Sequence, residues 1–69
     1  MAERVIWTAE KVRELGLVTN LETAGQILGM GRSKAYEMAR YDEFPVPVMR
    51  AGRKYTVSVT AILKYLGVE

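Results

Sequence analysis

Positively charged residues are concentrated in one segment of this chain. Of its ten lysines and arginines, six lie between Arg32 and Lys54 together with three acids, so the segment has a net charge of +3. The remaining four basic residues and five acids give the rest of the chain a net charge of −1. Such an asymmetry is typical of a surface that binds a polyanion. A solvated basic face without a ligand is the other interpretation.

The first of these residues open a predicted helix. Arg32, Ser33 and Lys34 occupy its first turn, where exposed backbone N–H groups favour a phosphate. In the major groove of DNA, arginine and lysine bind guanine O6 and N7, and serine binds several base edges. Tyr36 has two interpretations: it donates its hydroxyl to a phosphate, or it is a partly buried core tyrosine.

Two more polar residues follow on the same helix. Glu37 can accept a hydrogen bond from cytosine N4, but Lys34 and Arg40 each lie three residues away. Because charges at this spacing are neighbours on a helix, we favour an intrahelical ion pair for Glu37. The candidate DNA-contacting residues of the helix are Arg32, Ser33, Lys34, Tyr36, Glu37 and Arg40.

A second basic group, Arg50, Arg53 and Lys54, surrounds Gly52 at the tip of a predicted hairpin. Cations on a hairpin tip can contact phosphates or enter the minor groove. The alternative is a solvated turn that keeps an edge strand from aggregating. Three cations exceed what edge protection requires, so we predict a second DNA contact here.

The sequence offers little for catalysis or metal binding. It has no histidine and no cysteine, so the commonest general base and a strong nucleophile are both absent. Asp42 and Glu43 are adjacent and are more plausible as helix-terminating residues than as an acid–base pair. Glu10 and Glu14 share a helix face, but nothing indicates a metal or a pocket. We therefore expect no enzymatic activity, no cofactor and no metal.

The elements that position these groups follow from apolar spacing and capping residues. Thr8, Asn20 and Ser58 are predicted N-caps, and Gly16 and Gly67 are predicted stops. The predicted elements are helices over 8–15, 21–28, 32–41 and 58–66, a β-prone stretch at 17–19, and a hairpin within 46–57 that turns at Ala51-Gly52. The third helix is expected to stop because Pro45 disfavours helix in the residue before it. On the last helix, Ile62, Leu63 and Leu66 should share one apolar side.

Gly29-Met30-Gly31 separates the second and third predicted helices. Glycine costs about 1 kcal/mol relative to alanine inside a helix, so the pair marks a tight turn. A turn this short makes the two helices cross steeply, as in a helix-turn-helix. Gly25 should lie at the crossing, where a small residue lets the backbones approach closely. The predicted inner face consists of Ala24, Leu28, Met30, Ala35 and Met38.

In order and spacing, these residues resemble the excisionase and MerR-like group of small winged helix-turn-helix DNA-binding domains. The resemblance covers about residues 17–66. The matching residues are Ile27-Leu28-Gly29, Arg32-Ser33, Tyr36, Phe44-Pro45 and Gly52-Arg53. The chain departs from the group at Asn20, Gly31 and Ala35, where threonine, serine and a β-branched residue are usual.

The resemblance implies a mainly α fold with a small β-hairpin wing, in one compact domain. Residues 17–69 would form the winged helix-turn-helix, and residues 1–16 an additional N-terminal helix. It further implies an excisionase that binds double-stranded DNA sequence-specifically and bends it. Copies bound head-to-tail at adjacent sites would direct a phage integrase toward excision. A small AlpA- or MerR-like transcriptional regulator is the alternative, and a protein-interaction module whose basic face binds an acidic partner is a third hypothesis.

The N-terminal segment carries Trp7 and an apolar stripe. The stripe either enlarges a thin core or forms a surface for self-association. Its residues are Val5, Ala9, Val12 and Leu15. No apolar run approaches the roughly 18 residues of a membrane span. We expect no membrane partner and a location in the bacterial cytoplasm, associated with the nucleoid.

Overall fold

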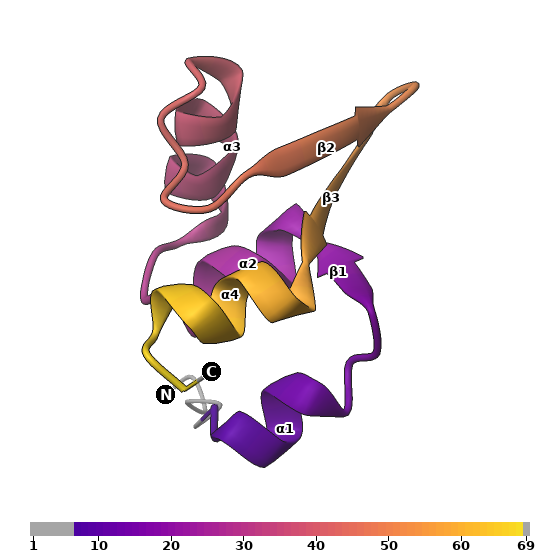
Figure 1. Cartoon of the computed structure of the whole chain (residues 1–69). Helices are drawn as coiled ribbons and strands as arrows, with labels where there is room; N and C mark the ends of the chain where they lie inside the picture. The colour runs from indigo at the N-terminus through magenta and orange to yellow at the C-terminus, as the bar shows by residue number, and fades with distance from the viewer. Residues whose placement is uncertain (1–6, 69) are drawn as a thin grey trace, which may run out of the picture.

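A computed structural model of the chain describes residues 7–68, which form four short helices and a three-stranded antiparallel sheet. The elements are α1 (Ala9–Arg13), β1 (Val18–Asn20), α2 (Leu21–Ile27), α3 (Arg32–Arg40), β2 (Val48–Ala51), β3 (Lys54–Ser58) and α4 (Val59–Tyr65). The helices α1, α2 and α4 make up one half of the molecule, and α3 and the β2–β3 hairpin rise from it (Figure 1). The architecture is therefore α plus β.

The sheet is larger than the sequence predicted. Its strand order is β1-β3-β2, so the predicted two-stranded hairpin gains a third strand from the β-prone stretch at 17–19. Val18 pairs with Ser58 on one side of β3, and Ala51 pairs with Lys54 on the other. Because β3 is central, the hairpin is joined by backbone pairing to the body of the molecule.

The hairpin turn lies one residue later than predicted. Ala51 is paired with Lys54, so the turn consists of Gly52 and Arg53. Gly52 has φ +63°, a value that glycine adopts without strain at the first position of a two-residue turn. The first arm is also shorter than predicted: β2 begins at Val48, and Val46 is buried in the core instead of pairing.

The break after α2 is confirmed, and its hydrogen bonds explain it. Gly29 has φ +85°. Its N–H donates to the carbonyl of Gln26 at 3.1 Å, and the N–H of Met30 donates to the carbonyl of Gly25 at 2.8 Å. This is the Schellman arrangement, which satisfies the last carbonyls of a helix while the chain leaves its axis. The helix α3 then starts at Arg32 and runs across the direction of α2 (Figure 1).

The two helices touch where the sequence predicted. A Cβ atom placed on Gly25 would lie 2.8 Å from the Cβ of Ala35, closer than real Cβ atoms approach. Only glycine therefore fits at this position without a shift of one helix. Of the predicted inner face, Ala24 and Ala35 are fully buried, and the other three members are half-buried.

The apolar core lies between α1, α2, β3 and α4. Its largest fully buried side chains are Leu21, Ile62, Val12 and Val57. α1 packs against α4, which encloses Val12 and brings Leu15 and Trp7 against the core. The interpretation that the N-terminal stripe enlarges the core is confirmed for these residues. Val5, the first member of the predicted stripe, lies outside the described residues.

The predicted N-caps are confirmed by hydrogen bonds. The side-chain oxygens of Thr8, Asn20 and Ser58 accept from backbone N–H groups three residues on, at 3.2, 2.7 and 3.2 Å. Of the predicted apolar side of the last helix, Ile62 and Leu63 are buried, whereas Leu66 lies just past the end of α4 and is 45% exposed. α4 ends at Tyr65, and Gly67 turns the chain with φ +80°. Among residues 7–68, no helix is both long and apolar enough to cross a lipid bilayer.

Candidate nucleic-acid interface

One side of α3 is polar and faces solvent. Its inner side is fixed by Ala35, which is fully buried against α2. On the outer side, a shallow open hollow of about 530 Å³ is lined by Arg32, Ser33, Tyr36 and Arg40. Glu37 and Tyr41 border an adjoining hollow that shares three of these residues. Five of the six predicted helix residues therefore line one continuous surface.

Lys34, the sixth predicted residue, is exposed but lines neither of these hollows. The reason is helical geometry: two residues after Arg32, its side chain is rotated by about 200° around an axis of 3.6 residues per turn. Charge and position in the first turn were the signals that singled out Lys34. They do not specify the direction in which a side chain points.

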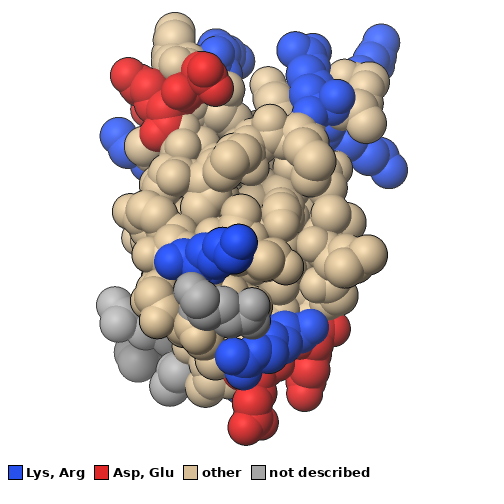
Figure 2. All heavy atoms as spheres, viewed as in Figure 1, with Lys and Arg blue, Asp and Glu red and all other residues tan. Residues whose placement is uncertain are grey.

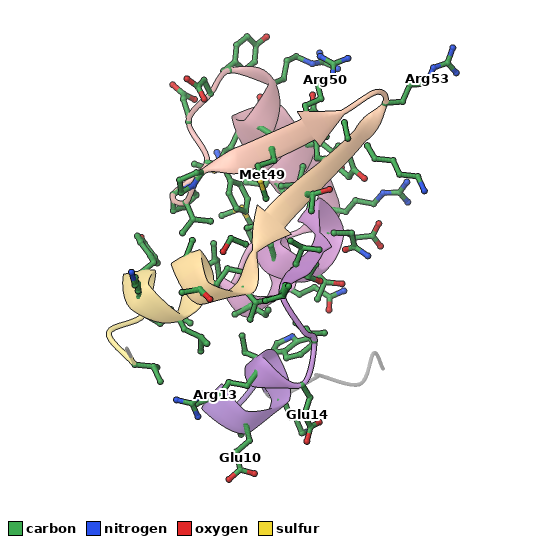
Figure 3. All side chains as sticks on the ribbon, turned by 45° about the vertical axis from the view of Figure 1, so that its right-hand side comes forward. Glu10, Arg13, Glu14, Met49, Arg50 and Arg53 are labelled. Carbon is green, nitrogen blue, oxygen red and sulfur yellow. The ribbon has the colours of Figure 1, made fainter. Side chains whose placement is uncertain are left out.

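The second basic group lies on the hairpin. Arg50, Arg53 and Lys54 are all exposed, and Figure 3 shows Arg50 and Arg53 extending from the end of the hairpin. The Nε–H of Arg50 donates to the carbonyl of Gly52 at 3.1 Å, so this side chain is tied to the turn. Arg53 is itself a turn residue and Lys54 begins β3.

Tyr36 and Tyr55 join the two basic surfaces. Their ring centroids lie 6.0 Å apart with an interplanar angle of 69°, an edge-to-face arrangement. A hollow of about 340 Å³ lies beside them and is also lined by Arg53, Lys54, Asn20 and Glu22. Tyr36 thus borders hollows on both of its sides, and the outer surface of α3 continues onto the hairpin.

Tyr36 is 40% exposed, so it is not the core tyrosine of the second interpretation. Tyr55 was missed as a site residue, because the sequence indicated only its preference for strands. The missing signal was strand register. With the turn at Gly52-Arg53, Tyr55 lies directly opposite Arg50, and the two side chains share the face that looks toward α3.

Each tyrosine ring also contacts an arginine. The Cζ atom of Arg32 lies 5.9 Å from the centroid of the Tyr36 ring, and that of Arg50 lies 5.7 Å from the centroid of Tyr55. Both distances are within the range of cation–π attraction. Each ring therefore has one guanidinium group beside it.

The predicted ion pair of Glu37 is not formed among the described residues, where Glu37 has neither Lys34 nor Arg40 as a partner. Instead, the Nε of Arg32 lies 3.5 Å from Oε2 of Glu22 on α2. Both side chains are largely solvated, so this pair contributes little to stability. Glu22 also lines the hollow beside Tyr36 that the hairpin residues Arg53 and Lys54 border, so the pair lies next to this part of the surface.

The acidic pair Asp42-Glu43 ends α3, as predicted. Asp42 has φ +58° and donates its N–H to the carbonyl of Ala39 at 3.2 Å, and Glu43 donates to Met38 at 2.7 Å. This is a second Schellman closure, with aspartate in the place that glycine usually occupies. The helix therefore ends before Pro45 can affect it.

The end of the hairpin is basic, whereas charges of both signs lie together at α1. Figure 2 shows lysine and arginine atoms gathered over the end of the hairpin, with acidic atoms near the end of α3 and at the opposite pole. Figure 3 places Glu10 and Glu14 of α1 at that pole, away from Arg50 and Arg53. In the described part of the chain, no three histidine, cysteine or carboxylate side chains group to hold a metal ion.

No protein-family model, no curated protein and no solved structure matches the chain. Functional inference therefore depends on the surface itself. Its hollows are open, and Glu37 and Glu22 each line one of them, but most of the polar residues that line them are arginine, lysine, serine and tyrosine. Such groups are donors to anionic oxygens. An open surface of this kind suits an extended anion better than a small anion, which an enclosed pocket would bind.

Proposed function

We propose that the protein binds double-stranded DNA as a winged helix-turn-helix. In this proposal α2 and α3 are the helix-turn-helix, α3 is the recognition helix in the major groove, and the β2–β3 hairpin is the wing. A helix of this diameter fits the major groove, and cations on a hairpin reach phosphates or an adjacent minor groove.

One observation carries the proposal. The hollows beside Tyr36 and Tyr55 make a continuous surface that includes Arg32 and Arg40 of α3 and Arg53 and Lys54 of the hairpin. Four cations from two separate elements thus lie along one face. DNA offers one negative charge per about 1.7 Å of helix axis, so an extended basic face can neutralise several phosphates at once.

The more specific proposal is an excisionase that binds adjacent sites cooperatively, bends DNA and directs a phage integrase toward excision. Its support is the resemblance of residues 17–66 to the excisionase and MerR-like group. The matching residues occupy functionally sensible places: Gly29 closes α2, Arg32 begins α3, and Gly52-Arg53 form the hairpin turn. A single module covers about one half-site, so neighbouring copies, head-to-tail, would gain affinity through effective concentration.

The test of DNA binding is a titration of duplex DNA at several salt concentrations. Arg53→Ala should weaken binding and reduce the slope of log K against log salt by about one unit, the effect of losing one phosphate contact. Lys34→Ala should also weaken binding, but less, because Lys34 is turned away from the continuous face. Lys64→Ala, on α4, removes the same charge elsewhere and is the matched control. If all three variants have the same slope as the wild type, DNA is not the partner and an acidic protein becomes the alternative.

The test of the excisionase role uses circularly permuted DNA fragments from an attachment region. Stepwise cooperative complexes whose mobility depends on the position of the site would indicate bending by adjacent copies. A bend of 40–90° costs on the order of 1–6 kcal/mol, which additional contacts must offset. A single complex without bending would favour the small transcriptional regulator instead.

A further inference from the structure

We propose that the Tyr36–Tyr55 pair couples the hairpin to α3 so that both elements bind DNA as one rigid unit. Tyr55 is then a positioning residue: it acts through Arg53 and Lys54, whose placement it fixes. This inference rests on the proposed function, since it concerns how the same surface engages DNA.

The Tyr36–Tyr55 pair lies where α3 and the hairpin make few other contacts with each other. Among the described residues, α3 packs chiefly on α2, and β2 packs chiefly on β3. The ring contact, with centroids 6.0 Å apart, spans the space between these two units. Figure 1 shows the same arrangement, with α3 and the hairpin rising separately from the body of the molecule.

The contact is part of a longer chain of interactions. On the α3 side, the Nε of Arg32 lies 3.5 Å from Oε2 of Glu22 in a solvated pair, and the guanidinium of Arg32 lies over the ring of Tyr36. On the hairpin side, the guanidinium of Arg50 lies over the ring of Tyr55, and its Nε–H is bonded to the carbonyl of Gly52. These side-chain contacts therefore form a continuous series from α2 to the tip of the hairpin.

Rigidity of this kind affects binding in a specific way. Two contacts that are held at a fixed spacing avoid the ordering cost that a mobile arm incurs on binding. β1 pairs with β3 only from Thr56 to Ser58. If the ring pair is lost, the part of the hairpin from Tyr55 to the turn is therefore free to move relative to α3, and its cations no longer meet phosphates while the helix is in the groove. Affinity then falls, and so does the number of counterions released, although no charge has been removed.

The experiment replaces Tyr55 with leucine and with phenylalanine and measures DNA affinity over a range of salt. Tyr55→Leu should weaken binding about tenfold, which corresponds to about 1.4 kcal/mol, and should lower the salt slope by about two units through loss of the Arg53 and Lys54 contacts. Tyr55→Phe keeps the ring pair and should bind like the wild type. On a shorter duplex that ends before the hairpin's site, Tyr55→Leu and the wild type should bind equally.

Two further variants provide a second way to break the ring pair and a control. Tyr55 packs against the core, so Tyr36→Leu breaks the same pair from the more exposed side if Tyr55→Leu does not fold. It should lower the salt slope by a similar amount. Tyr65→Leu, on α4, is the control for loss of an exposed tyrosine and should leave both quantities unchanged.

The outcomes separate the two proposals. A folded Tyr55→Leu or Tyr36→Leu protein with an unchanged salt slope overturns the coupling while DNA binding stands. Equal losses in Tyr55→Phe and Tyr55→Leu also overturn it, because they assign the effect to the hydroxyl. If the wild type itself shows no salt-dependent binding to any duplex, the proposed function fails, and the coupling fails with it.

Discussion

The two halves of the molecule use the same kinds of residue differently. In the body formed by α1, α2 and α4, large apolar side chains such as Leu21 and Ile62 are fully buried. In the half formed by α3 and the hairpin, Tyr36 remains exposed and Tyr55 half-buried, and arginines lie over their rings. One half thus gains stability by excluding water, and the other keeps its aromatic and charged groups accessible.

A chain of 69 residues accommodates a buried core and an accessible surface by keeping them in different halves. A domain of this size buries only about 60% of the surface of its unfolded chain, so its core cannot extend under every element. Here the core is concentrated at one end, and α3 is attached to it by the Gly25–Ala35 contact. Substitutions should therefore divide into those that change stability and those that change binding.

The largest stability effect should follow from opening the core. Ile62 is fully buried on α4, and Ile62→Ala should lower the free energy of unfolding by about 2 to 5 kcal/mol. Urea denaturation followed by circular dichroism measures this quantity. Leu66→Ala, at the end of the same helix but 45% exposed, should change it by less than about 0.5 kcal/mol. Equal losses in the two variants would contradict the described core.

A smaller effect is expected where the halves join. Gly25→Ala gains about 1 kcal/mol of helix propensity, yet its Cβ would lie 2.8 Å from that of Ala35. Overpacking of this kind should outweigh the gain and lower the free energy of unfolding by about 1 to 3 kcal/mol. The exchange variant Gly25→Ala/Ala35→Gly removes the clash. The loss of free energy of unfolding in the double variant should therefore be smaller than the sum of the losses in the two single variants. If the two losses simply add, the close approach of the helices is unimportant.

The smallest effect should be a gain, at the end of α3. Asp42 is a non-glycine residue at φ +58°, a conformation that costs other residues energy but that glycine adopts freely. Asp42→Gly should raise the free energy of unfolding by up to about 1 kcal/mol. Glu43→Gly removes the same charge at the next position, without a positive φ, and should not stabilise the protein. Thermal melts of the two variants distinguish strain relief from loss of negative charge.

Local features were predicted from the sequence with good accuracy because their causes are local. A capping side chain acts on a backbone group three residues away, as Thr8, Asn20 and Ser58 do. Likewise, a glycine such as Gly29 ends a helix through its own backbone freedom. The polar outer side of α3 followed from the same short-range spacing, which is why most of its predicted residues lie together.

The errors fall where distant parts of the chain meet. The third strand, the burial of Val46 and the exposure of Leu66 depend on which segments pack together, and residue preferences do not determine this. The pair between Arg32 of α3 and Glu22 of α2 depends on the same packing. The ion pair predicted for Glu37 is a separate case, because its expected partners Lys34 and Arg40 lie on its own helix, where a solvated pair contributes little.

By itself, the sequence determined the order of helices and strands and the two positions, Gly29 and Asp42, where α2 and α3 end. It also determined the concentration of positive charge between Arg32 and Lys54. Only the tertiary structure decided that Val46 is buried and that Tyr55 belongs to this surface. The physical reason is that a spacing along the chain fixes neighbours within one helix. The meeting of α3 with the hairpin depends on the turn at Gly52-Arg53 and on the register of β2 and β3.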